Sequence, residues 1–176
     1  MPHDATIDLM PIKQYGLDLD QYFGLWVVAE GQFLAMFDRV SQLNLAAHVQ
    51  VNGGQKLEAA ATRPVTNART SEVTIGIVDI NGTLMKRGTS LSNSSSLVNI
   101  RRVIGTAARD PEIDAILLRI DSPGGTLAGT QEVADAVRQA RESKPVFALV
   151  EDLAASAAYW IASQAERVYA NTPTAL

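Results

Sequence analysis

The chain has 176 residues, a hydrophobic content of 47% and a formal net charge of -4, values typical of a globular protein with one sizeable core and an extension. It has no cysteine, which excludes thiol catalysis, disulfides and thiolate metal sites. The negative charge excludes a broad basic surface for nucleic acid, and the two histidines, His3 and His48, are too far apart in sequence to indicate a metal site. We therefore expect cofactor-free chemistry.

The first fifty residues have the pattern of a helical extension. The start, Met1 to Asp4, lacks the basic and apolar regions of a secretory signal, and polar residues interrupt the apolar stretch from Tyr22 to Val40, which disfavours a membrane span. Between Phe33 and Leu45 the apolar residues recur with helical spacing. We expect a soluble, cytoplasmic protein with an N-terminal helical extension over residues 1–50, which either packs on the rest of the chain or serves as an interaction arm.

The next segment is rich in glycine, alanine and threonine and contains Pro64. This composition is typical of a linker, and we predict one over residues 51–70, followed by a single domain over residues 71–176.

The domain opens with an apolar, β-branched run from Val73 to Ile80 that ends in Asn-Gly, which predicts a strand and its turn. Residues 85–96 have no period and predict a mobile loop. A helix follows, because apolar residues share one face until Asp110-Pro111 ends the pattern. The residues of that face are Leu97, Ile100, Ile104 and Ala107.

Strands and helices alternate over the remainder of the chain. The expected elements are a strand over 115–120, a helix over about 128–142, a strand over 146–150, a helix over about 155–164 and a strand from 167 to 170. Short apolar strands separated by helices predict an α/β fold of repeated β-α-β units with a largely parallel sheet. Ligands bind such sheets at the carboxyl ends of the strands.

Two motifs lie at those ends. Residues 121–125, Asp-Ser-Pro-Gly-Gly, follow one strand, and the small-residue segment 153–160 follows the next. Paired glycines let backbone amides approach a ligand closely, and a serine at the start of a helix can attack a carbonyl while amides stabilise the oxyanion. The pattern indicates acyl chemistry with Ser156 as the nucleophile.

These motifs resemble those of the S49 peptidases, the signal peptide peptidase A family, which has the ClpP/crotonase fold. The resemblance runs from about Val73 to the last residue. The family's strand ends in Asn-Ser-Pro-Gly-Gly, and its nucleophilic serine lies before small residues and an aromatic pair. Ser156 matches that serine. Here Asp121 replaces the usual asparagine and Ala157 replaces a common glycine, and neither change removes a backbone amide.

The resemblance implies an oxyanion hole formed by the amides of Gly125, with Gly124 as second choice, and Ala157. It also implies a serine endopeptidase acting on a protein or peptide substrate, in the soluble branch of the family that includes the head-maturation proteases of tailed phages. Members assemble into oligomers, so a homo-oligomer is expected.

The family uses a lysine as general base some tens of residues beyond the serine. No lysine follows Ser156 in this sequence, and Lys86 and Lys144 have the pattern of solvated surface residues. We therefore expect the base beyond residue 176, the C-terminal part of the fold to be missing, and this chain alone to be inactive.

Other interpretations remain open at this point. Taken alone, Ser156 has the pattern of a helix N-cap or a close-packing residue, and it is the paired glycines after the preceding strand that favour a nucleophile. Asp121 is expected to fix its turn, Ser122 to hydrogen-bond within its loop, and Tyr159 and Trp160 to belong to the core rather than to a substrate groove. The alternative functions are an acyl-CoA enzyme of the crotonase type and a non-catalytic assembly or scaffold component.

Overall fold

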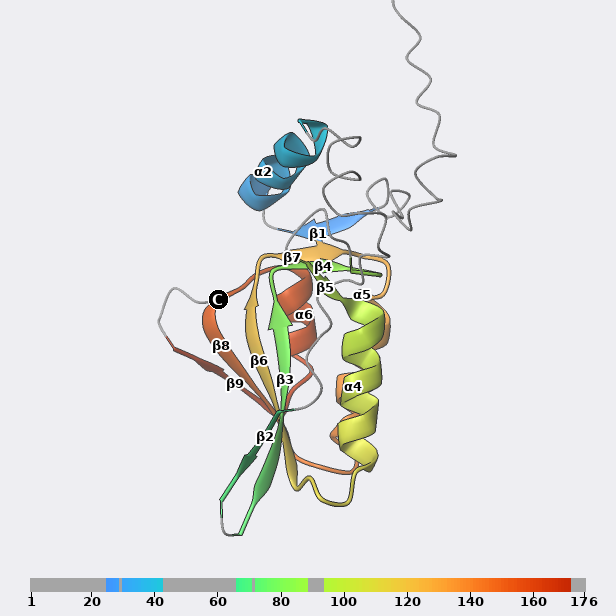
Figure 1. The fold of residues 1–176 in the computed structure, drawn as a ribbon, viewed down its shortest axis with the longest axis vertical. Helices are drawn as coiled ribbons and strands as arrows, with labels where there is room; N and C mark the ends of the chain where they lie inside the picture. The colour runs from blue at the N-terminus through green and yellow to red at the C-terminus, as the bar shows by residue number, and fades with distance from the viewer. Residues whose placement is uncertain (1–24, 29, 43–65, 71, 89–93, 172–176) are drawn as a thin grey trace, which may run out of the picture.

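The computed structural model describes residues 25–28, 30–42, 66–70, 72–88 and 94–171 (Figure 1). The predicted N-terminal helix is present as α2 (Glu30–Ser41), which begins three residues earlier than the pattern indicated. Both histidines and most of the predicted linker lie outside the described residues. None of the helices in the described segments is long and apolar enough to cross a membrane.

The main sheet confirms the predicted α/β class and its repeated β-α-β units. Its order is β2-β3-β6-β8-β9, and all strands except the edge strand β2 run parallel to their neighbours. The strands are β2 (Thr66–Arg69), β3 (Thr74–Asn81), β6 (Ala115–Ser122), β8 (Val146–Ala154) and β9 (Arg167–Ala170). Because β2 lies within residues 51–70, the end of the range predicted as linker is instead an edge strand of the domain.

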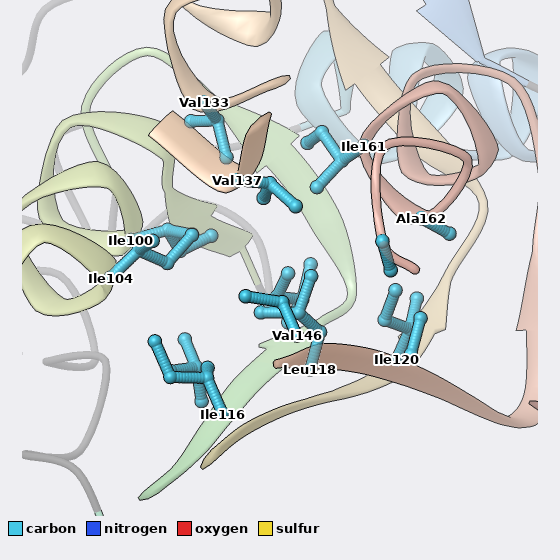
Figure 2. Packing of buried hydrophobic residues seen from close by; sticks show 14 of the residues in the cluster. Ile100, Ile104, Ile116, Leu118, Ile120, Val133, Val137, Val146, Ile161 and Ala162 are labelled. Atoms are coloured by element: carbon cyan, nitrogen blue, oxygen red, sulfur yellow. The ribbon is translucent and has the colours of Figure 1, made fainter. Parts of the chain in front are cut away.

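Three helices cover one face of this sheet: α4 (Leu97–Arg109), α5 (Thr130–Ala140) and α6 (Ala157–Ala162) (Figure 1). Every second residue of β6 is buried beneath them. Figure 2 shows how the apolar side chains of the helices and strands converge on one core. Fully burying a side chain of this size stabilises the fold by about 1.5–3 kcal/mol. The labelled members are Ile100, Ile104, Ile116, Leu118, Ile120, Val133, Val137, Val146, Ile161 and Ala162.

Helix α4 begins and ends where its sequence predicts. Ser96 is its N-cap and accepts a hydrogen bond from the amide of Asn99 at 3.3 Å. Asp110, which precedes a proline, has extended backbone and ends the helix. The Lys144 ammonium donates to the carbonyl oxygens of Ala107 and Asp110, so a cation lies at the helix C-terminus, where it is stabilising.

A second, smaller sheet has the order β1-β7-β4-β5. Its strands are β1 (Trp26–Val28), β7 (Gly124–Thr126), β4 (Thr83–Met85) and β5 (Ser94–Ser96). Strand β1 runs antiparallel to β7, whereas β4 runs parallel to β7 and β5. The sheet lies across the end of the main sheet at which β3 and β6 terminate (Figure 1).

The loop predicted over residues 85–96 is wrong at both of its ends. Met85 closes β4 and residues 94–96 form β5, while residues 89–93 lie outside the described part of the chain. Strands of three residues are too short to show a period of two, and a serine run such as 94–96 has low strand propensity, which is why the sequence pattern missed them.

On the sheet face opposite the helices, paired residues of neighbouring strands carry charged side chains. Asp79 on β3 lies opposite Arg119 on β6, and the Arg119 Nε atom lies 2.7 Å from the Asp79 carboxylate. Glu151 on β8 lies further from the same nitrogen, at 3.9 Å. The hydrogen bond that Arg119 donates to the Asp79 carboxylate, reinforced by the negative charge of that group, raises the pKa of Arg119. This cross-strand pair links the strands that lead to the site described next.

Candidate active site

The two turns predicted to be neighbours are in contact. Strands β6 and β8 are paired to their carboxyl ends, where Ser122 lies opposite Ala154. Immediately beyond that pair, the amide of Ala155 donates to the carbonyl oxygen of Ser122 at 3.1 Å. The Gly-Gly segment and Ser156 therefore leave the sheet at the same place.

Ser156 lies on a strained turn between β8 and α6. Its backbone has φ 56° and ψ -115°, and within the described part of the chain no other non-glycine residue has a positive φ. Such a conformation costs about 1–3 kcal/mol and persists only where the surrounding structure imposes it. A strained strand-to-helix turn is also how nucleophilic serines are displayed in other hydrolase folds.

The Ser156 side chain does not act as a helix N-cap, the alternative role that its sequence position suggested. The residue occupies the N-cap position of α6, yet its hydroxyl makes no capping hydrogen bond. Its carbonyl oxygen accepts the amide of Trp160 at 2.9 Å, which begins the helix without help from the side chain. The hydroxyl is therefore not used to cap the helix. Ser156 is half-buried, so it is not enclosed in the core.

The amide of Ala157 meets the glycine turn. Ala157 is the first residue of α6 and is fully buried, and first-turn amides have no acceptor within a helix. Among the described residues no acceptor is recorded for it. A Cβ built on Gly124 would stand 3.0 Å from this amide nitrogen, so the two loops touch here.

Gly124 requires the absence of a side chain, and its own amide is already used. Its φ is 96°, and an added Cβ would stand 2.5 Å from the carbonyl oxygen of Val27. The Gly124 amide donates to the hydroxyl of Ser122 at 3.2 Å, and that hydroxyl donates to the carbonyl oxygen of Gly82 at 2.7 Å. Ser122 therefore hydrogen-bonds within its loop, as predicted, and the Gly124 amide is used to shape the turn.

Gly125 lies between two strands. An added Cβ would stand 1.8 Å from the carbonyl oxygen of Leu84 on β4, so no side chain fits. On the other side Gly125 lies opposite Val27 of β1. The amide of Leu127 donates to the oxygen of Leu25 at 2.8 Å, and hydrogen-bonded pairs alternate along an antiparallel ladder. By that alternation the Gly125 amide faces the Val27 carbonyl.

Two further sequence expectations can be compared with the structure. Asp121 fixes its turn through its backbone, because its carbonyl oxygen accepts the amide of Gly82 at 2.9 Å. The expectation that Tyr159 is a core residue is wrong: it is 48% exposed, because this part of α6 faces away from the sheet. Trp160 is half-buried.

Of the two lysines in the described segments, Lys144 lies far from this cluster. Lys144 precedes β8 and is bound to the end of α4, whereas Ser156 follows β8. A strand of this length separates its ends by roughly 25 Å. Lys86 is exposed after β4, and its carbonyl oxygen accepts the amide of Val98 at 3.3 Å.

Sequence reasoning missed two contributors to the site. One is the hydroxyl bridge through Ser122 to Gly82, which depends on a long-range contact with no local signal. The other is β1, whose Trp-Val-Val triplet has strand propensity but is too short to be distinguished from the helix that follows.

The comparisons with known proteins agree with the motifs. The model of peptidase family S49 matches residues 138–176. The capsid assembly protease C of Escherichia phage lambda is 38% identical over 53% of this chain, and Protease 4 of Haemophilus influenzae is 30% identical over 57%. These matches span 22% and 16% of the relatives' own lengths.

Among solved structures, an enoyl-CoA hydratase from Shewanella pealeana has a TM-score of 0.42 at 13% identity, over 62% of this chain and 47% of the other. The motifs around Gly125 and Ser156, the family model and the protease relatives agree: the chain is similar to the S49 peptidases over the part that they match.

Proposed function

We propose that this chain carries the nucleophile and the oxyanion donors of a serine endopeptidase of the Ser-Lys type. The observation that carries the proposal is the strained backbone of Ser156, whose hydroxyl makes no capping bond and whose neighbouring amide, Ala157, meets the glycine turn. A core or capping serine has no need of a positive φ, whereas a displayed nucleophile does.

The reaction then follows the chemistry of acyl transfer. The Ser156 oxygen attacks the carbonyl carbon of a peptide bond while its proton passes to the general base. The amides of Gly125 and Ala157 stabilise the resulting oxyanion, and each such donor contributes about 2.7–4 kcal/mol to the transition state. The C–N bond breaks as the base returns the proton to the leaving amine, and water hydrolyses the acyl-enzyme to regenerate the serine.

We propose a lysine outside residues 1–176 as that base. The two described lysines are unsuitable, because Lys144 is bound at the far end of β8 and Lys86 is exposed, whereas a lysine base needs an apolar environment that lowers its pKa. On this proposal residues 1–176 alone are inactive, and activity requires a segment that carries this lysine.

The lambda relative's name suggests a protein substrate in capsid assembly, and we extend that class of substrate to this chain. A homo-oligomer belongs to the same proposal. The acyl-CoA alternative lacks a comparable observation, since a thioester enzyme does not require a strained serine at position 156.

A fluorophosphonate probe tests the proposal. The chain as given and a version extended by the following gene sequence are treated with the probe, and the modified residue is located by mass spectrometry. We expect an adduct at Ser156 in the extended version, none in its Ser156→Ala variant, and an unchanged adduct in Ser163→Ala, which alters the exposed C-cap serine of α6. Absence of labelling in the folded extended version would favour the scaffold alternative.

A further inference from the structure

Strand β1 lies on the edge that the proposed reaction needs. The second sheet has the order β1-β7-β4-β5, so β1 is its outer strand and covers the backbone of β7. The register places Val27 opposite Gly125 and Val28 opposite Gly124. If β1 were absent, β7 would be an open strand edge, which is a template for an extended polypeptide.

The carbonyl group of Val27 reaches the corner between the two glycines and α6. Its oxygen lies 2.5 Å from the position of a Cβ on Gly124, and the amide nitrogen of Ala157 lies 3.0 Å from the same point. The Gly125 amide faces the same carbonyl by the alternation of the ladder. A backbone carbonyl of the chain itself is thus held where the proposed oxyanion donors converge.

Strand β1 is short and has few buried contacts that hold it in place. It has three residues, and all three are half-buried. Leu25 beside it is 74% exposed, and Val27 is the residue of β1 that packs against the core. Local unfolding of a short segment with few buried contacts requires little free energy compared with global unfolding. The ring of Trp26 contacts that of Phe33 with centroids 5.5 Å apart, so β1 is attached to α2.

We propose that β1 is an internal ligand of the β7 edge, which competes with an extended polypeptide for the same backbone hydrogen bonds. This inference rests on the proposed peptidase function, because the polypeptide in question would be the chain to be cut. Its consequence is that the N-terminal segment must leave β7 before the Gly125 amide is available to a substrate.

A redox-controlled staple provides the first test. Trp26 lies opposite Thr126 in the pairs that alternate with the hydrogen-bonded ones, where Cα atoms are about 4.5 Å apart, within the range of a disulfide. Because the chain has no cysteine, Trp26→Cys with Thr126→Cys creates a single possible bridge. The two single variants are the controls, since each carries the same substitution without the ability to cross-link.

The probe is a fluorescein-labelled peptide that copies residues 23–30, Phe-Gly-Leu-Trp-Val-Val-Ala-Glu, with binding followed by fluorescence anisotropy. All proteins also carry Ser156→Ala, so that no turnover contributes. We expect the reduced double variant to bind the peptide and the oxidised form to bind at least about tenfold more weakly, since apparent affinity falls with the fraction of open molecules.

Proline substitution provides the converse test. Val27→Pro removes the amide that faces Gly125 and prevents the strand from pairing, whereas the amide of Val28 faces away from β7 by the same alternation. We expect Val27→Pro to bind the peptide about tenfold more tightly than the parent, and Val28→Pro to bind as the parent does. Circular dichroism melting verifies that the proline variants are folded, and the staple decides the question should Val27→Pro unfold.

Equal peptide binding by the oxidised and reduced double variants would overturn the proposal, as would absence of binding to both the reduced form and a folded Val27→Pro. The failure of the peptidase proposal has a different signature, because it is the loss of fluorophosphonate labelling at Ser156 in the extended version. Peptide competition without labelling would retain β1 as an internal ligand of a binding edge and remove the hydrolase.

Discussion

The hydroxyl of Ser122 accepts a hydrogen bond from the amide of Gly124 at 3.2 Å. This bond separates the roles of the two adjacent glycines, since it uses one amide to shape the turn and leaves that of Gly125 for the edge of β7. The same hydroxyl donates to Gly82 at 2.7 Å, so one buried oxygen joins the turn after β3 to the turn after β6.

Ser122→Ala is expected to destabilise the protein by about 1–3 kcal/mol, because it leaves the Gly124 amide and the Gly82 carbonyl without a side-chain partner in a buried site. The free energy of unfolding from urea titration measures this loss. Ser163→Ala is the matched control: its hydroxyl bonds to the carbonyl oxygen of Trp160 at 2.8 Å, but the residue is exposed, so a change within about 0.5 kcal/mol is expected. Equal effects of the two substitutions would contradict the bridging role.

Ser156→Gly and Ser156→Ala both remove the hydroxyl, but they differ in backbone freedom. Glycine accepts the positive φ of this position without strain, whereas alanine retains the strain of serine. We expect the glycine variant to be more stable than the alanine variant by about 1 kcal/mol, measured by urea unfolding. A more stable alanine variant would show that the turn is not strained in solution.

Gly125→Ala is expected to cost about 3 kcal/mol or more, because the new methyl group would stand 1.8 Å from the Leu84 carbonyl oxygen and force β4 and β7 apart. Gly105→Ala in α4 is its control, since the nearest atoms there belong to the flexible side chain of Arg109, at 3.5 Å. The control should gain about 0.5–1 kcal/mol of stability from reduced backbone entropy. Thermal unfolding of both variants checks the contrast in sign.

Lys144→Met is expected to lower stability by about 1–3 kcal/mol, because it removes a charged donor from the carbonyl oxygens of Ala107 and Asp110 at the end of α4. Lys86→Met changes an exposed residue and should alter stability by less than about 0.5 kcal/mol. Both variants should retain fluorophosphonate labelling in the extended version. Loss of labelling in a folded Lys86→Met would identify that lysine as the general base and refute an external one.

The elements with a clear period could be predicted from sequence. The face of α4, with Leu97, Ile100, Ile104 and Ala107, is fully buried, and β6 and β8 both appear where apolar runs indicated them. Both strands extend beyond their apolar runs, because pairing between β6 and β8 continues through polar residues as far as Ser122 and Ala154. Backbone pairing does not require hydrophobic side chains.

The short strands of the second sheet could not be predicted. Strands β1, β4, β5 and β7 have three residues each, and their existence depends on partners distant in sequence, such as Val27 opposite Gly125. Local patterns contain no information about such partners. For the same reason the engagement of Gly124 by Ser122 was invisible, although both residues were singled out as part of one motif.

For the candidate site, the sequence indicated which residues meet but not how they are held. The adjacency of Gly124 and Ala157 follows from parallel neighbouring strands, and the structure contains it. The positive φ of Ser156 has no signal in residue type, because serine rarely adopts that conformation and tertiary structure imposes it. The catalytic roles of Ser156, Gly125 and Ala157 stay predictions that the labelling experiment tests.

The irregular pairing at the end of β6 and β8 determines the direction in which Ser156 leaves the sheet. Between two successive paired positions β6 advances from Ile120 to Ser122, whereas β8 advances from Val150 to Ala154. The additional residues of β8 determine toward which face of the sheet the following side chains point, because neighbouring positions on a strand point to opposite faces. Removing one of these residues would turn the hydroxyl toward the other side of the sheet while leaving the composition of the motif almost intact.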